Sequence, residues 1–146
     1  MRSTRESPRD LGGRVIGIDT NIIVRLLTRD DQKQFDAAVA LFKSGSVDAP
    51  LFVNPIVIAE TVWVLERVYK TDRASVRTQV AGLLDTVEIA VPDVLRMGNW
   101  ADLLSSPHPD FSDTLISEIN RANGCEKTMT FDRKAANSVP GMELLA

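Results

Sequence analysis

Four acidic side chains are spaced along the chain at places where a folded sheet could bring their carboxylates together. Asp19 and Asp132 each follow directly on a short apolar run, Asp113 follows a proline-containing loop, and Glu60 lies within the most apolar segment. Carboxylates that share one cleft repel each other unless a cation lies between them, and Mg²⁺ takes oxygen ligands of this kind. A cation held in this way can activate water for attack on a phosphodiester. Metal-dependent hydrolysis is therefore the chemistry that these residues favour.

The usual ligands of a zinc site are nearly missing from the sequence. His108 is the only histidine and Cys125 the only cysteine, so a zinc site with nitrogen and sulfur ligands is effectively excluded. A single cysteine also rules out an internal disulfide, which fits a reducing cytosol. We expect His108 to be a solvated loop residue and Cys125 to be a small hydrophobe of the core.

The elements that must position the acids alternate between strand and helix. Short apolar or alternating runs predict strands at residues 15–18, 51–53, 87–91 and 127–131. Helical spacing and capping residues predict helices at residues 22–27, from Asp30 or Asp31 to about Gly45, and at residues 56–69, 72–84, 93–104 and 112–123. This alternation predicts an α/β fold, a three-layer α/β/α sandwich with a central, mainly parallel sheet.

Such a sheet would gather three of the acids at one edge. Ligands bind beyond the carboxyl ends of parallel strands, and Asp19 and Asp132 each stand directly after a predicted strand. Asp113 falls in the first turn of a predicted helix, and helix N-termini commonly reach the same edge. Asp110 could cap that helix or be a fifth acid, and we favour a place in the loop or just outside the metal ligands.

Glu60 is the acid that is hardest to explain as a structural residue. The helix predicted around it is apolar nearly all round, so we expect this helix to be central and Trp63 to lie in the core. A buried carboxylate needs a partner, and Arg67 is seven residues further on, too far for a local pair. We therefore expect Glu60 to have a partner from elsewhere in the chain.

The other acids each have an ordinary structural interpretation. Asp19 could cap a helix, Asp132 could be a turn residue, and Asp113 could be a favourable charge in a first helical turn. A non-catalytic domain that binds a protein or RNA therefore stays open, and so does a structure-specific DNA nuclease. A haloacid-type phosphatase fits poorly, because Asn21 stands where its second aspartate is needed.

Bulk properties narrow the class of protein further. The 146 residues suit one domain, and the hydrophobic share of 44% and charged share of 25% are ordinary for a globular protein. A net charge of −3 counts against nucleic-acid binding through a broad basic surface. We interpret residues 1–13 as a flexible leader and residues 14–146 as the domain. No apolar run is long enough to span a membrane and no hydrophobic signal region begins the chain, so we expect a cytoplasmic protein.

Four segments resemble the motifs of PIN domains, in order and on the expected elements. Residues 16–21, Ile-Gly-Ile-Asp-Thr-Asn, resemble the opening strand and its Asp-Thr-Asn motif, and residues 54–60 resemble the second motif, an acid within a helix. Residues 110–116 resemble the third motif, whose acid maps to Asp113, and residues 130–133 resemble the fourth. The order and spacing are similar to those of VapC-type toxins of toxin–antitoxin pairs, over roughly residues 14–146.

The resemblance implies an activity and a set of partners. It implies a compact α/β/α sandwich, Mg²⁺ or Mn²⁺ bound by the acids, endoribonuclease activity on an RNA substrate, homodimerisation, and inhibition by a cognate antitoxin protein. On this hypothesis Asp19 and Asp113 are the principal metal ligands, and Glu60 and Asp132 complete the pocket. The remaining candidates would orient ligands or water (Thr20, Asn21 and Thr130) or contact phosphates (Arg25, Arg133 and Lys134).

Overall fold

The chain folds into two compact units, which we call unit 1 (Met1–Pro92) and unit 2 (Asp93–Ala146). The computed structural model describes residues 15–91, 103–104 and 110–145. The predicted leader at residues 1–13, the loop that contains His108 and most of the predicted helix 93–104 lie outside the described residues. The last two residues of that predicted helix, 103–104, are helical.

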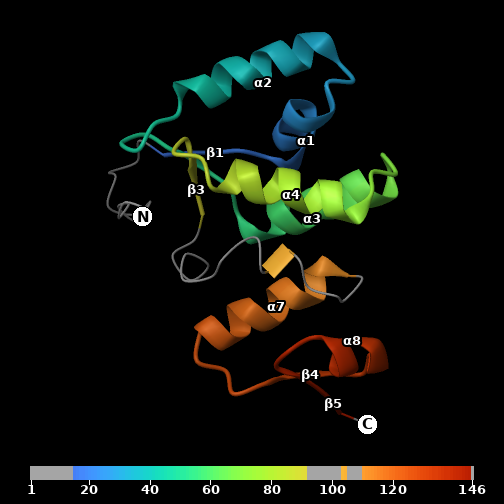
Figure 1. Cartoon of the computed structure of the whole chain (residues 1–146). Coiled ribbons are helices and arrows are strands. Elements are labelled where there is room, and N and C mark those ends of the chain that lie inside the picture. Colours follow the sequence, from blue (N-terminus) through green and yellow to red (C-terminus); the bar gives the residue numbers. More distant parts are fainter. Residues whose placement is uncertain (1–14, 92–102, 105–109, 146) are drawn as a thin grey trace. The chain divides into compact units, whose positions relative to one another are not determined.

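Unit 1 contains a sheet of three parallel strands (Figure 1). The strands are β1 (Ile16–Gly17), β2 (Leu51–Phe52) and β3 (Ile89–Ala90), in the order β1-β2-β3. Hydrogen bonds continue past the strand ends, from the N–H of Ile18 to the Phe52 carbonyl at 3.1 Å and from the N–H of Val53 to the Ala90 carbonyl at 2.9 Å. The three strands predicted in this part of the chain are confirmed, with shorter regular pairing than the sequence suggested.

Four helices accompany this sheet, and each begins at a side-chain cap. They are α1 (Thr20–Thr28), α2 (Gln32–Ser44), α3 (Pro55–Arg67) and α4 (Arg73–Leu84), capped in turn by Asp19, Asp31, Asn54 and Asp72. A cap side chain accepts a hydrogen bond from a backbone N–H that the helix itself leaves unpaired, which fixes where the helix starts. α1 packs against α2 and against α3, and Figure 1 shows it between these two helices.

The core of unit 1 consists of aliphatic side chains from the sheet and from one face of each helix. α3 and α4 contribute equally many buried side chains to it, but α3 is not buried all round. Ile56 and Trp63 are 70% and 54% exposed, so the expectation that Trp63 lies in the core is wrong. The largest fully buried side chains of unit 1 are Ile23, Leu51, Ile58, Leu65, Leu84, Ile89, Val53 and Val76.

One charged pair is buried between α3 and α4. Nε of Arg77 lies 3.6 Å from Oε1 of Glu66, and the side chains are only 6% and 16% exposed. This distance makes an ion pair but is too long for a good hydrogen bond. Burial lowers the pKa of the Arg77 guanidinium, with a contribution from the nearby charge of Arg73, while Glu66 acts in the opposite direction. The packing of these two helices therefore depends on charges that have been removed from water.

Unit 2 contains a second parallel pairing, between β4 (Thr128–Thr130) and β5 (Met142–Leu144). The helix α7 (Phe111–Ala122) comes before β4, and the short helix α8 (Arg133–Ser138) connects the two strands. The predicted end of α7 is confirmed, because Asn123 caps it and Gly124 follows with φ +89. The sequence did not predict α8 or β5, and Cys125 is exposed rather than part of the core.

The predicted α/β class is confirmed, because helices alternate with strands and all the described strand pairs are parallel. The described strands lie in two sheets, one in each unit. Along the described parts of the chain, no helix has both the length and the apolar character that a membrane crossing requires.

Replacing Gly141 by Ala is expected to destabilise unit 2 by about 2–4 kcal/mol. Gly141 has φ +88, and a Cβ at this position would lie 2.8 Å from Oγ of Ser117. That hydroxyl cannot move easily, because Ser117 is buried and donates to the Pro140 carbonyl at 2.6 Å. Urea unfolding would measure the loss.

Gly124→Ala is the matched control for this substitution. Gly124 also has a positive φ, of +89, but no described atom lies within 4 Å of an added Cβ. This variant should lose only the backbone contribution, about 1–2 kcal/mol. Equal losses for the two variants would show that the contact with Ser117 does not matter.

Candidate metal centre

Asp19, Thr20 and Glu60 form one hydrogen-bonded group in unit 1. The backbone N–H of Thr20 donates to Oδ1 of Asp19 at 2.7 Å, and the Thr20 hydroxyl donates to Oε2 of Glu60 at 2.6 Å. Thr20 is buried, whereas both acidic residues are exposed. An ionised carboxylate has about four acceptor positions, so each acid keeps positions for a further ligand. Thr20 therefore ties the two carboxylates together without using up their oxygens.

The parallel sheet explains why these residues meet. Asp19 and Asn54 are each the second residue after the end of their strand, β1 and β2, and each caps the helix that follows. Because neighbouring parallel strands end at the same edge, α1 and α3 start side by side there. Glu60 is the sixth residue of α3, so it lies in the second turn above this edge.

The structure corrects one expectation about Glu60 and confirms another. Glu60 is exposed, and the expectation that it is buried is wrong. It shares its face of α3 with the exposed side chains of Ile56 and Trp63, which lie one turn before it and one turn after it. The expectation that its partner comes from elsewhere is confirmed, because Thr20 belongs to α1.

The third predicted motif lies at the start of α7. Asp110 is the N-cap of this helix, and Oδ1 of Asp110 accepts a hydrogen bond from the N–H of Ser112 at 2.9 Å. Asp113 lies in the first turn and is partly exposed. Of the two interpretations of Asp110, the structure supports the cap. Both carboxylates also stand near the positive end of the helix dipole.

The fourth predicted motif lies between β4 and α8. Asp132 is exposed and caps α8, and Oδ1 of Asp132 accepts from the N–H of Ala135 at 3.1 Å. Its own backbone N–H donates to Oγ1 of Thr130 at 3.0 Å. Thr130 thus fixes the backbone at Asp132, and the hydrogen bond from Ala135 fixes the Asp132 side chain. Arg133 and Lys134 are exposed at the start of the same helix.

The acids are divided between the two units. Asp19 and Glu60 belong to unit 1, and Asp113 and Asp132 belong to unit 2. In the described parts of the chain, no group of three or more His, Cys, Asp or Glu side chains is arranged to hold a metal ion. The candidate ligands that the structure brings together are therefore the pair that Thr20 links.

The chemistry of this pair fits a hard divalent cation. Its donors are all oxygens, two from carboxylates and one from a hydroxyl, and the carboxylates carry like charges that a cation would neutralise. Mg²⁺ is usually held by one or two carboxylates, with waters and phosphate oxygens as its other ligands. Asp19 and Glu60 meet that requirement, because both are exposed and the buried Thr20 holds them in place.

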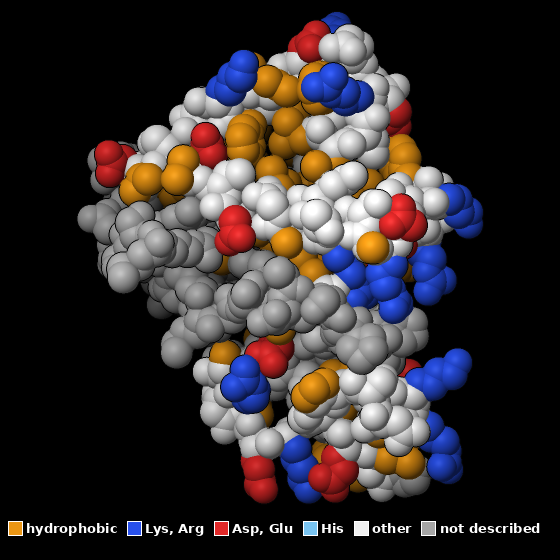
Figure 2. All heavy atoms as spheres, viewed as in Figure 1, with side chains coloured by type: hydrophobic (Ala, Val, Ile, Leu, Met, Phe, Trp, Pro, Cys, Tyr) orange, Lys and Arg blue, Asp and Glu red, His pale blue; other side chains and the backbone are white. Residues whose placement is uncertain are grey.

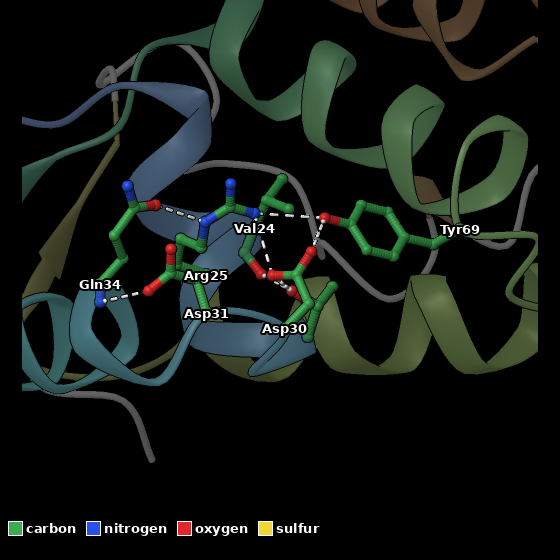
Figure 3. A network of polar contacts seen from close by, with 7 residues as sticks. Val24, Arg25, Asp30, Asp31, Gln34 and Tyr69 are labelled. Atoms are coloured by element: carbon green, nitrogen blue, oxygen red, sulfur yellow. Dashed lines mark hydrogen bonds and ion pairs between the residues drawn. The ribbon is translucent and has the colours of Figure 1, made fainter.

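Arg25 belongs to a polar network that joins α1, α2 and the chain after α3 (Figure 3). Its Nη1 donates to Oδ1 of Asp30 at 3.0 Å and to Oη of Tyr69 at 3.2 Å, and its Nε donates to Oε1 of Gln34 at 2.6 Å. The Tyr69 hydroxyl donates to Oδ2 of Asp30 at 2.6 Å. Arg25 is a predicted phosphate contact, but most of its N–H donors are already engaged with other side chains of the protein.

The network also fixes the charges of its members. The hydrogen bond with Tyr69 raises the pKa of the Arg25 guanidinium, with a further contribution from the carboxylate of Asp30. The same tyrosine lowers the pKa of the Asp30 carboxyl, with smaller contributions from Thr28 and Arg25. Tyr69 lies 44 residues from Arg25 and 39 from Asp30, so no local spacing rule could have revealed this network.

A comparison with protein families finds one that covers most of the chain. The model of the PIN domain matches residues 16–139, a range that includes all four predicted motifs. A search of curated proteins gave no match.

Proposed function

Because the chain belongs to the PIN domain family, a nuclease fold, we propose that it is a Mg²⁺-dependent endoribonuclease. The observation that carries the proposal is the pair of exposed carboxylates, Asp19 and Glu60, that Thr20 links at the carboxyl edge of a parallel sheet. This arrangement suits the binding of a cation together with a phosphodiester. The resemblance of all four motifs to toxin ribonucleases supports RNA as the substrate.

We assign each candidate residue a role in the proposed cleavage reaction. Asp19 and Glu60 would hold the metal from unit 1, and Asp113 and Asp132 would supply further carboxylates. Thr20 would keep the two carboxylates of unit 1 in place through its hydroxyl and its backbone N–H. Arg133 and Lys134, both exposed beside Asp132, would contact RNA phosphates. When bound, the metal would supply a strong nucleophile from water and stabilise charge on the phosphate.

Incubation of the protein with matched RNA and DNA strands, in Mg²⁺, tests this function directly. We expect cleavage of the RNA, complete loss of cleavage when EDTA is added, and recovery with excess Mg²⁺ or Mn²⁺, because carboxylates alone cannot activate water in this way. Cleavage of DNA alone would replace the proposal with a DNA nuclease. RNA binding without cleavage in any divalent metal would replace it with a non-catalytic binding module.

The resemblance to VapC-type proteins supports a more specific biological role. We propose that the chain is the toxin of a type II toxin–antitoxin pair, that it acts as a homodimer, and that a separate antitoxin protein inhibits it. Induced expression should then arrest growth, and co-expression of a small protein from the neighbouring reading frame should relieve the arrest. Normal growth during expression of a form that cleaves RNA in vitro would contradict the toxin role.

A further inference from the structure

One face of α3 carries a row of exposed side chains that passes through the candidate metal centre. They follow one another at intervals of four, three and four residues, which places them on the same face of the helix: Ile56, Glu60, Trp63 and Arg67. We call these residues the α3 row. The hydrogen bond from the Thr20 hydroxyl to Oε2 of Glu60, at 2.6 Å, connects the row to the site. A ligand that binds beside Glu60 on this face is therefore close to the carboxylate pair.

Trp63 presents a large aromatic surface to solvent beside Glu60. It is 54% exposed, and it lies three residues after Glu60, about 4.5 Å further along the helix axis. Burial of an indole contributes strongly to a hydrophobic core, and Trp63 buries only part of its surface in this way. An exposed indole offers a flat face on which an unpaired base can stack, whatever the base. Trp63 is therefore placed to hold a base near a phosphate bound at the carboxylates.

Positive charge follows Trp63 towards the turn that joins α3 to α4. Residues 67–73 contain one acid, Asp72, and three basic residues, which are all exposed: Arg67, Lys70 and Arg73. In Figure 1 this turn lies at the end of unit 1 away from the three strands, and Figure 2 shows Lys and Arg side chains gathered at that end. The whole chain has a net charge of −3, so the segment differs in sign from the average. Phosphates are the groups that such a segment attracts.

The order of the groups along the α3 row matches a single strand of nucleic acid. From Glu60 to Arg67, about 10 Å of the helix axis carries a carboxylate suited to a metal and its phosphate, then an aromatic ring, then a cation. A duplex keeps its bases stacked inside and would leave Trp63 without a base to contact. A second copy of the chain packed on the row would bury the Glu60 carboxylate and remove it from the metal site. The row therefore favours a strand with unpaired bases.

We propose that the α3 row binds the unpaired strand next to the phosphate that is cut, with one base stacked on Trp63 and a later phosphate held by Arg67. Both side chains position the strand and take no part in the reaction at the phosphate. This inference rests on the proposed function for the identity of the strand as RNA. The binding of a single strand is a separate property, which can be measured when nothing is cut.

Quenching of the Trp63 fluorescence by single-stranded RNA tests the proposal. The full chain carries Trp100→Phe, so that Trp63 is its only tryptophan. The probe is an oligouridylate of about ten nucleotides in Ca²⁺, checked to stay intact, and stacking should quench the emission as it binds. An abasic strand of the same length keeps the phosphates but has no base to stack. It should bind about tenfold more weakly and leave the emission unchanged.

Substitutions of Trp63 separate stacking from other contacts, with binding measured by the anisotropy of a labelled oligouridylate. Trp63→Ala should weaken binding about tenfold or more, and Trp63→Phe should restore most of the affinity, because a phenyl ring also stacks. Val87→Ala is the matched control and should bind like the parent. Val87 is 50% exposed, but it lies just before β3, at the amino edge of the sheet, opposite the edge that carries Asp19.

The salt dependence of binding tests the role of Arg67. Arg67→Gln should reduce the slope of log affinity against log salt by about 0.7, the contribution of one phosphate contact in a single strand. Lys43→Gln is the matched control, since Lys43 is exposed in the last turn of α2 and is not part of the α3 row. It should leave the slope unchanged. An equal change of slope in both variants would show general attraction by charge and overturn the assignment of Arg67.

Several results would overturn the proposal for the α3 row. Equal binding of the oligouridylate and the abasic strand would show a site for phosphates only. Parental affinity in Trp63→Ala would show that no base stacks there. If the parent bound no strand, and Trp63→Ala converted a dimer into a monomer in sedimentation, the row would belong to the contact with a second copy of the chain.

The cleavage assay separates this proposal from the function on which it rests. Trp63→Ala should raise the KM for RNA about tenfold and leave kcat nearly unchanged, because stacking holds the strand equally before and during the reaction. Parental KM in this variant would overturn the strand proposal alone. Binding with quenching by the parent, but no cleavage in Mg²⁺, would overturn the nuclease proposal alone.

Discussion

Asp19→Asn is expected to reduce RNA cleavage by more than about 100-fold while leaving the protein folded. Replacing a residue that merely orients a metal ligand typically costs 10- to 100-fold in activity, so the loss of a ligand should cost at least as much. Asparagine caps helices as well as aspartate does, so α1 should keep its start. The measurement is the rate of RNA cleavage in Mg²⁺, with thermal unfolding as the check on folding.

The chain offers a matched control for this substitution. Asp31 caps α2 through its side chain, as Asp19 caps α1, but it is not part of the carboxylate group. Asp31→Asn should therefore cleave RNA at the parental rate. Asp113→Asn and Glu60→Gln should behave like Asp19→Asn. If Asp19→Asn and Asp113→Asn both cut as fast as the parent, the assignment of the metal centre is wrong.

Thr20 should act through the acids that it holds. Thr20→Val removes the hydroxyl that contacts Glu60 but keeps the backbone N–H that contacts Asp19, so activity should fall by about 10- to 100-fold. Thr20→Ser should restore most of it. A higher Mg²⁺ requirement for Thr20→Val, with unchanged thermal stability, would separate positioning of the ligands from a purely structural role.

The second large effect concerns stability and the pair between α3 and α4. Glu66→Leu should lower the free energy of unfolding by about 3–5 kcal/mol, because it removes the carboxylate that lies beside the buried Arg77 guanidinium. The double variant Glu66→Leu, Arg77→Leu should recover most of this loss, since it removes both charges from the interior. Urea unfolding of the parent, both single variants and the double variant gives the coupling energy.

An exposed pair serves as the control. Arg121 and Glu118 lie 2.6 Å apart on α7, but Arg121 is 71% exposed. Exposed pairs contribute at most about 1 kcal/mol, so Glu118→Ala should have a small effect. A coupling energy near zero for Glu66 and Arg77 would mean that water reaches this pair and that the helices do not depend on it.

Much of the fold could be predicted from local rules. The starts of α2, α3 and α4 follow from Asp31, Pro55 and Asp72, because caps and a first-turn proline act over a few residues. α8 was missed because it is only six residues long, too short to show a helical period. β5 was missed because no apolar run marks it in the sequence, where Met142 and Leu144 stand alone on either side of Glu143.

The candidate site was harder to predict than the fold. The exposure of Glu60 could not be read from α3, since an apolar helix can still leave Ile56 and Trp63 in solvent. An aspartate that follows a strand looks the same in sequence whether it caps a helix, binds a metal or does both. The contacts of Thr20 with Glu60 and of Arg25 with Tyr69 span about forty residues, so only tertiary structure reveals them.

The capping role of the acids has an evolutionary consequence. Asp19, Asp110 and Asp132 each begin a helix, and asparagine can do so equally well. An aspartate codon becomes an asparagine codon through one base change. A single point mutation in the gene is therefore enough to encode a chain that folds and keeps its surface but lacks the cleavage activity proposed above. Such a chain would keep the folded surface that recruitment as a binding protein requires.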